Sequence, residues 1–128
     1  MLFTHGFGRH QNIQRSVTPA FGDDSRLVLF DYAGSGRSDL GAYDERQYDS
    51  LNGYAQDVLD LRAAPGLHDA VFVGHSVSGV VGILVAIREP RRFSNLVLVG
   101  PSPRYVNAPP DYFGGFERPD IEGLLKRP

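Results

Sequence analysis

The stretch that decides the fold lies at residues 71–79, which read VFVGHSVSG. The apolar residues predict a short buried strand, and the residues after Ser76 predict the start of a helix. A strand, a strained turn and a helix in this order form a nucleophile elbow, which exposes a serine hydroxyl at its apex. Gly74 and Ser78 are small, as they must be where the turn brings neighbouring backbone together. We therefore predict that Ser76 is a catalytic nucleophile, at a helix N-terminus that favours a developing anion.

A structural interpretation of the same stretch is open, because Ser and Gly are favoured at helix N-termini and Ser76 could simply cap the helix. The segment His-Gly-Phe-Gly at residues 5–8 favours catalysis, since it follows another predicted strand. Acyl transfer needs backbone N–H donors aimed at an oxyanion, and a glycine-rich turn presents them without side-chain obstruction. We assign the backbone N–H groups of Phe7 and Val77 as the oxyanion hole. An ordinary glycine turn is the alternative for residues 5–8.

Residues 31–38, DYAGSGRS, contain a G-x-G pattern that could be mistaken for a phosphate cradle. A dinucleotide fingerprint needs a third glycine and a helix that opens directly, but Asp39 stands at the third position. We interpret the segment as a structural loop and predict no cofactor. Asp31 is not assigned as a triad acid, because it precedes the serine whereas the acid of such an elbow follows it.

None of the four histidines is a convincing general base. His75 adjoins Ser76, and neighbouring residues on a strand point to opposite faces, so its ring should face away from the serine hydroxyl. His5 is expected to orient its own loop, and His68 lies in the turn before a strand. His10 follows the glycine turn near the expected pocket mouth and is a weak candidate.

Composition excludes several classes of protein. A chain of 128 residues with 41% hydrophobic and 22% charged residues is typical of one globular domain. A net charge of -2 argues against a nucleic-acid partner. The absence of cysteine excludes disulfides, thiolate zinc sites and a cysteine nucleophile, and we predict no metal site. The N-terminus has no signal-peptide pattern, and the longest apolar run, residues 79–87, is too short for a membrane span. We expect no membrane partner and a cytoplasmic location.

Short apolar runs alternate with helical segments, which indicates parallel βαβ units. We predict a core at residues 1–100 and a Pro- and aromatic-rich connection into a further element at residues 101–128. The expected strands are 1–4, 27–30, 71–73 and 96–99, and the expected helices are 12–21, 49–64, 77–88 and the start of one at 120–126.

Several blocks in this order resemble the α/β-hydrolases of the RsbQ type, the bacterial sigma-B regulators whose subfamily includes plant karrikin and strigolactone receptors. The blocks are residues 5–8, 29–36, 73–78, 99–105 and 112–117. The resemblance covers nearly the whole chain. It implies an α/β fold, here a partial α/β-hydrolase with a parallel sheet of about four strands, helices on both faces and the start of a helical lid at the C-terminus.

The resemblance also implies a Ser-Asp-His hydrolase with a small hydrophobic pocket, which regulates the energy-stress response together with a PAS-domain phosphatase. Only Ser76 and the amides of Phe7 and Val77 transfer to this sequence. The acid and the histidine are expected beyond Pro128, and two further strands before Met1. The four strands should lie in the spatial order second, first, third, fourth. Because both sheet edges would be open, we expect the isolated chain to dimerise, aggregate or fold only partly.

Three hypotheses follow. The first is a serine hydrolase that cleaves a small apolar ester, lactone or related carbonyl compound. The second is a signalling receptor that binds a small hydrophobic molecule and engages a protein partner, with hydrolysis incidental. The third is a truncated fragment with no function of its own. The sequence does not separate the first two, because such receptors retain the serine.

Overall fold

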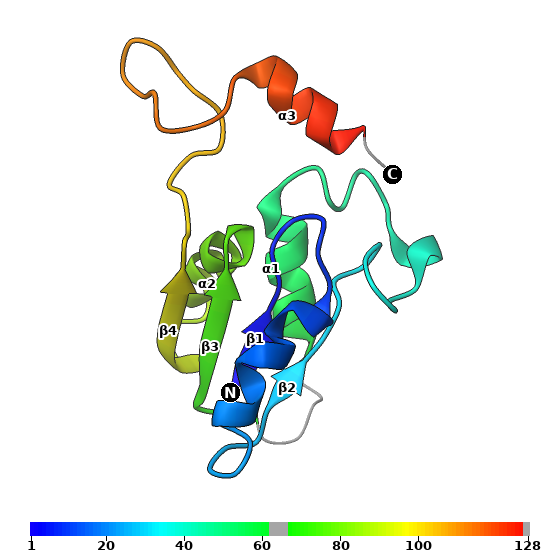
Figure 1. Ribbon diagram of the computed structural model, residues 1–128, viewed down its shortest axis with the longest axis vertical. Helices are drawn as coiled ribbons and strands as arrows, with labels where there is room; N and C mark the ends of the chain where they lie inside the picture. The colour runs from blue at the N-terminus through cyan, green and yellow to red at the C-terminus, as the bar shows by residue number, and fades with distance from the viewer. Residues whose placement is uncertain (62–66, 127–128) are drawn as a thin grey trace.

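Four parallel strands form the sheet, in the order β2-β1-β3-β4. The computed structural model describes residues 1–61 and 67–126. The strands are β1 (Leu2–Thr4), β2 (Val28–Leu29), β3 (Ala70–His75) and β4 (Phe93–Val99). The predicted fold class and the predicted strand order, second, first, third, fourth, are therefore confirmed. The sheet has β2 and β4 at its edges, with β1 and β3 between them (Figure 1).

The two long helices pack together on one face of the sheet (Figure 1). Helix α1 (Leu51–Asp60) lies inside the predicted range 49–64, of which residues 62–64 fall outside the described part of the chain. Helix α2 (Val77–Arg88) has the predicted bounds. It follows β3 after a single residue, Ser76, which positions the serine at the carboxyl end of the sheet.

The helix predicted at residues 12–21 is wrong in type. The segment forms two 3-10 helices, η1 (Gln11–Ser16) and η2 (Thr18–Ala20), in front of β1 and β2 in Figure 1. Pro19 explains part of the difference, because its ring and its missing N–H oppose a continuous α-helix. A further short 3-10 helix, η3 (Leu40–Ala42), follows the loop after β2.

The hydrophobic core lies between the sheet and the pair α1–α2. Leu2 and Phe72 from the central strands meet Val58 of α1 and Val85 of α2, and all four are fully buried. The central strands β1 and β3 read as apolar runs because neighbouring elements cover them, whereas the edge strand β4 is largely exposed. Close packing also explains Gly82, since a Cβ at this position would lie 2.4 Å from a ring carbon of Phe72.

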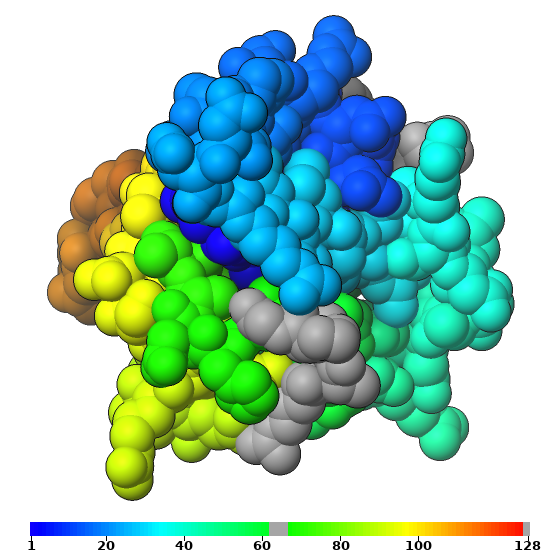
Figure 2. Space-filling model, turned by 90° about the horizontal axis from the view of Figure 1, so that it is seen from below, coloured from blue at the N-terminus to red at the C-terminus, as the bar shows by residue number. Residues whose placement is uncertain are grey.

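After β4 the chain passes over the carboxyl ends of the strands and leads into helix α3 (Arg118–Leu125) (Figure 1). Backbone hydrogen bonds from Asn107 to Phe116 and from Phe116 to Tyr105, both 2.9 Å, close the loop before α3. Figure 2 shows the opposite end of the molecule, where the blue N-terminal turns and the yellow-green α2–β4 connection lie on different sides with green residues between them. The division into a core and a lid connection at residue 100 stays a prediction.

No helix in residues 1–61 or 67–126 is long and apolar enough to cross a membrane.

Candidate active site

Ser76 occupies the single residue between β3 and α2, and its backbone is strained. Its φ of 56° and ψ of -123° lie in a region that L residues rarely adopt. The N–H of Ser76 donates to the carbonyl oxygen of Val99 at 2.8 Å, and the N–H of Gly79 donates to the carbonyl oxygen of Ser76 at 2.9 Å. The turn is thus tied to β4 on one side and to the first turn of α2 on the other.

The small residues around Ser76 are required by close backbone contacts. A Cβ at Gly74 would lie 2.6 Å from the carbonyl oxygen of Ser78, a distance that real Cβ atoms essentially never show. Ser78 is fully buried and its hydroxyl donates to the carbonyl oxygen of His5. The elbow geometry therefore accounts for Gly74, and Ser78 lies fully buried in the same contact.

The glycine turn after β1 packs directly against the elbow. A Cβ at Gly6 would lie 3.1 Å from the Cβ of Ser76 and 3.0 Å from Nδ1 of His75, so a side chain at this position would press on the elbow. Gly8 has a φ of +63°, which favours glycine. Phe7 lies between the two glycines with 57% of its surface exposed. The two segments that we singled out in the sequence are thus neighbours in space.

The backbone N–H groups of Phe7 and Val77 have no acceptor among residues 1–61 and 67–126. Val77 opens α2, and the first N–H groups of a helix have no partner within the helix. The hydroxyl of Ser76 likewise makes no hydrogen bond to a described residue. A serine hydroxyl and two unused donors therefore lie on adjacent segments. Their assignment as nucleophile and oxyanion hole remains our hypothesis.

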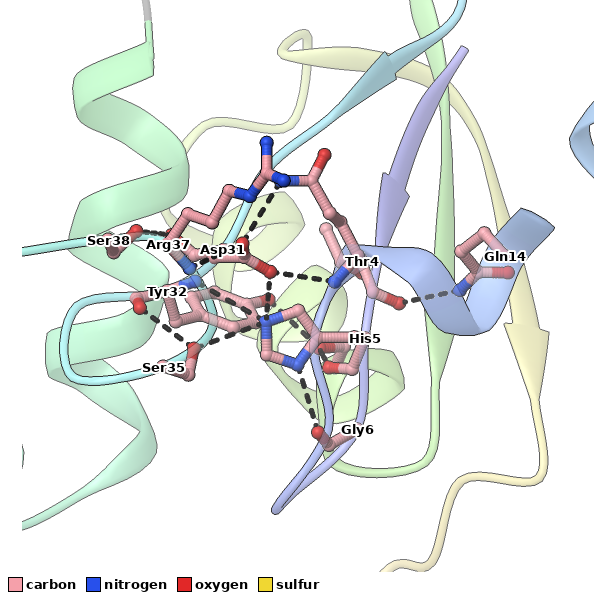
Figure 3. Close-up of polar contacts among 11 residues, drawn as sticks. Thr4, His5, Gly6, Gln14, Asp31, Tyr32, Ser35, Arg37 and Ser38 are labelled. Carbon is pink, nitrogen blue, oxygen red and sulfur yellow. Dashed lines mark hydrogen bonds and ion pairs between the residues drawn. The ribbon is translucent and has the colours of Figure 1, made fainter.

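A buried polar network holds the glycine turn in place (Figure 3). The imidazole of His5 contacts the carbonyl oxygen of Gly6 through Nδ1 at 3.0 Å. Its Nε2 lies 3.4 Å from the N–H of Tyr32 and 3.3 Å from the hydroxyl of Ser35. Because the carbonyl oxygen of Gly6 can only accept, Nδ1 carries a proton and donates it to Gly6, while Nε2 also lies 3.7 Å from the carboxylate of Asp31. His5 therefore orients its own loop, as its place in the sequence suggests.

Asp31 organises the loop that carries the G-x-G pattern. Its carboxylate accepts hydrogen bonds from the backbone N–H of Gln11 at 2.7 Å and of Arg37 at 3.0 Å. Burial alone would raise the pKa of Asp31, but the hydrogen bonds from Arg37 and Gln11 outweigh it and hold the pKa below 3.8. A Cβ at Gly36 would overlap this carboxylate. These contacts support the interpretation of residues 31–38 as a structural loop.

The structure brings none of the four histidines into a described hydrogen bond with the hydroxyl of Ser76. His10 is exposed and lines a separate polar cavity of about 310 Å³ with Asp31 and Arg37. His68 is exposed at the turn before β3. Nδ1 of His75 is buried against the Gly6 turn without a described partner. No group of three or more acidic or histidine side chains that could hold a metal occurs among the described residues.

A cavity of about 650 Å³ opens beside the elbow and the glycine turn. Its wall is mainly aromatic: the rings of Tyr43 and Tyr48 stack with centroids 5.3 Å apart, and Tyr54 lies 4.8 Å from Tyr48. On the far side α3 contributes Ile121 and Leu125. The other large apolar side chains of the lining are Phe7, Tyr32, Leu51, Val77, Val81 and Tyr105.

Sequence reasoning missed Tyr43 and Tyr48 as parts of this wall. The available signal is the recurrence of tyrosine at 43, 48 and 54, ahead of and within a helix whose other apolar residues predict an ordinary buried face. Tyr48 also donates a 2.9 Å hydrogen bond to Asp57, which fixes its ring at the cavity. An apolar guest would contact aromatic faces on one side and the elbow on the other.

Comparison with known proteins identifies the fold family of the chain. The family model for the alpha/beta hydrolase fold matches residues 1–127. The chain is 40% identical over 126 residues to a probable esterase of Oryza sativa subsp. japonica, covering 98% of this chain and 46% of that protein. It is 38% identical over 125 residues to a strigolactone esterase of Arabidopsis thaliana, again covering 98% and 46%.

A solved structure gives the same result. A hydrolase from Oleispira antarctica is 41% identical and superposes with a TM-score of 0.86, over 97% of this chain and 45% of that one. The chain thus spans about half the length of the relatives it matches. The match to the family model over nearly all residues, with the parallel sheet and the elbow between β3 and α2, shows that this chain belongs to the alpha/beta hydrolase family.

Proposed function

We propose that this chain supplies the nucleophile and the oxyanion hole of a serine hydrolase that cleaves small apolar esters or lactones. One observation carries the proposal. The strained Ser76 packs against Gly6, and its neighbour Val77 and the Gly6–Gly8 turn line an aromatic cavity, so a carbonyl group lodged at that wall would lie beside the serine and the two unused amides. The relatives named as esterases support the same class of reaction.

In the proposed reaction, Oγ of Ser76 attacks the carbonyl carbon and its proton passes to a base. The carbonyl oxygen becomes an oxyanion that accepts hydrogen bonds from the N–H groups of Phe7 and Val77. The tetrahedral intermediate collapses, the bond to the leaving alkoxy group breaks, and that group takes the proton from the base. Water then attacks the acyl group and gives a proton to the base, the bond between the acyl carbon and Oγ of Ser76 breaks, and the base gives that proton to Oγ as the acid product leaves. We propose a histidine with an acid partner as this base, and we assign neither role to a described residue.

The cavity supports an apolar substrate of limited size. Its lining consists largely of tyrosine rings and the aliphatic side chains of α2 and α3, and its two charged side chains, Arg9 and Asp49, are both exposed. Burying an unpaired charge in such a site is costly, whereas apolar surface gains from burial. A lactone or ester with a compact apolar body matches this lining better than a sugar or a phosphate does.

The test is hydrolysis of p-nitrophenyl acetate by the complete polypeptide that carries this chain. Ser76→Ala should lower kcat by at least about 10³-fold, because it removes the attacking atom. A fluorophosphonate probe should label Ser76 in the wild type only. Unchanged hydrolysis by Ser76→Ala would contradict the proposal. The 128-residue chain alone should turn over very slowly, and rapid Ser76-dependent hydrolysis by it would contradict the external histidine.

A second candidate function is that of a small-molecule receptor. The observation in its favour is a 38% identity over 126 residues to a protein named karrikin insensitive 2 receptor CA of Petunia hybrida, of which the chain covers 46%. For either candidate we propose a role in the bacterial sigma-B stress response, a PAS-domain phosphatase as partner and a cytoplasmic location. Stress signalling measured with Ser76→Ala separates the candidates: retained signalling favours a receptor, and lost signalling favours catalysis.

A further inference from the structure

The second residue after the proposed nucleophile carries a hydroxyl where the elbow pattern commonly has glycine. Ser78 is 0% exposed, and its hydroxyl donates to the carbonyl oxygen of His5. The hydroxyl of Tyr32 lies 2.9 Å from Oγ of Ser78. A hydroxyl has one proton, and Ser78 gives its proton to His5, so Tyr32 must be the donor in the second hydrogen bond. The chain Tyr32–Ser78–His5 therefore has a fixed direction.

Tyr32 is suited to act as a permanent donor. Burial raises the pKa of Tyr32 to about 12, so the phenol keeps its proton at all ordinary pH values. Its ring makes edge contacts with His5, at a centroid distance of 5.1 Å, and with Tyr54, at 5.4 Å. These contacts fix where the hydroxyl points. Ser78 is thus held on one side by the segment that follows β2, and it holds the end of β1 on the other.

The hydrogen bonds at His5 determine the orientation of two consecutive peptide units. Ser78 holds the carbonyl of the His5–Gly6 unit, and Nδ1 of His5 donates to the carbonyl of the Gly6–Phe7 unit at 3.0 Å. A trans peptide is planar, so its N–H points away from its carbonyl. With the Gly6 carbonyl held by the imidazole, the N–H of Phe7 must face the opposite side.

Ser78 also lies in the same first helical turn as Val77, whose N–H is the other unused donor. A displacement of the Gly6 turn relative to α2 would therefore change the spacing of the two donors. The side chain that joins the turn to this helix, through a direct hydrogen bond, is Ser78. Glycine at position 78 would fit the elbow, but the Gly6 turn would then lose its hydrogen bond to α2.

We propose that Ser78 is a positioning residue, which sets the N–H of Phe7 against Ser76 and the N–H of Val77 through the hydrogen-bonded chain Tyr32–Ser78–His5. The proposal rests on the proposed hydrolase function, because it concerns the oxyanion hole of the same site. It adds that Ser78 and Tyr32 determine how well the N–H groups of Phe7 and Val77 point to the same oxyanion.

The test uses Ser78→Ala in the complete polypeptide that carries this chain, with p-nitrophenyl acetate as substrate. Deleting one oxyanion donor outright costs about 10²–10³-fold in kcat, so loosening one should cost about 10–100-fold. KM should change by less than about threefold, since the substitution removes only one buried hydroxyl from the cavity lining. Tyr32→Phe keeps the hydrogen bond from Ser78 to His5 but removes the hydroxyl that donates to Ser78, so it should lower kcat less than Ser78→Ala does. It therefore tests the same hydrogen-bonded chain if Ser78→Ala does not fold.

Val85→Ala is the matched control, because Val85 is fully buried in the same helix and does not line the cavity. It should lower the melting temperature and leave kcat unchanged. If Ser78→Ala and Tyr32→Phe both keep the wild-type kcat while Ser76→Ala abolishes hydrolysis, the positioning role is wrong and the hydrolase function stands. If the wild type shows no Ser76-dependent hydrolysis, the proposed function fails instead.

A measurement that does not depend on turnover tests the positioning role even if the wild type shows no Ser76-dependent hydrolysis. Backbone ¹⁵N order parameters of Gly6 and Phe7 should fall from rigid values of about 0.85 toward about 0.6 in Ser78→Ala, and stay unchanged in Val85→Ala. Unchanged order parameters and amide chemical shifts in Ser78→Ala would overturn the positioning role whatever the substrate is.

Discussion

Replacing Ser76 by alanine and, separately, by glycine measures the backbone strain at the elbow. The residue has a φ of 56° and a ψ of -123°, which glycine adopts much more readily than alanine. Both variants lose the hydroxyl, and that group makes no hydrogen bond to a described residue. The difference between the two variants therefore isolates the backbone from the chemistry of the side chain.

The magnitude follows from two opposing terms. A residue held in such a sparsely populated region costs about 1–3 kcal/mol, which glycine avoids. Glycine loses about 0.5–1 kcal/mol more than alanine in conformational entropy on folding. The balance leaves Ser76→Gly more stable than Ser76→Ala by about 1 kcal/mol.

The assay is urea unfolding followed by circular dichroism, with the two variants compared in the same polypeptide. Ser78 offers a matched control, because it lies in α2 two residues further on, with helical backbone. There the order should reverse, with Ser78→Gly less stable than Ser78→Ala by up to about 1 kcal/mol. If Ser76→Gly is no more stable than Ser76→Ala, the strained turn does not exist in the folded protein and the elbow is wrong.

Three further predictions concern packing and buried charge. Gly82→Ala should destabilise the fold by about 1–3 kcal/mol in urea unfolding, because the added Cβ would overlap the ring of Phe72, and an unchanged midpoint would contradict the packing described. Asp31→Asn should cost about 2 kcal/mol at pH 7, where the lowered pKa keeps the wild-type carboxylate charged and hydrogen-bonded. The wild type loses that advantage as the pH falls through the lowered pKa, so the gap should close below pH 3.8, and a gap independent of pH would refute the argument. Burial raises the pKa of Asp57 despite its hydrogen bond from Tyr48, so the folded state disfavours the charged carboxylate. The contribution of Asp57 to the free energy of unfolding therefore declines as the pH rises through that raised pKa. Asp57→Asn, which keeps an acceptor for Tyr48, should raise the unfolding midpoint at pH 7 relative to the wild type, and a lower midpoint would contradict this.

The part of the fold that sequence could predict is the part governed by local pattern. Continuous apolar runs identified the strands, and the glycine-flanked Ser76 between β3 and α2 identified the order of the central elements. The same reasoning failed at residues 12–21, where a weak pattern and Pro19 gave two 3-10 helices in place of one α-helix. Local signals decide an element only when they agree with one another.

The site was predictable only in its backbone. Gly74 has no side chain because the elbow folds back on it at Ser78, and Gly6 has none because the glycine turn touches the elbow; the glycine pattern in the sequence is enough to suggest both. The bond from Ser78 to His5 joins residues 73 positions apart, and no periodicity reports such a contact. The same holds for the aromatic wall, where Tyr43 comes from a loop whose course tertiary contacts determine.

Helix α3 has no buried residue, although Ile121 and Leu125 form one side of the cavity and Leu125 is 64% exposed. Few contacts hold this helix over the tyrosines, so its docked position is only weakly favoured over an open one. A small apolar ligand in the cavity would touch both α3 and the tyrosines, and would add contacts that neither surface makes when the cavity is empty. By thermodynamic linkage, occupancy then strengthens helix docking by the same factor by which docking strengthens occupancy. Any protein that recognises the docked helix would therefore sense whether the cavity is filled.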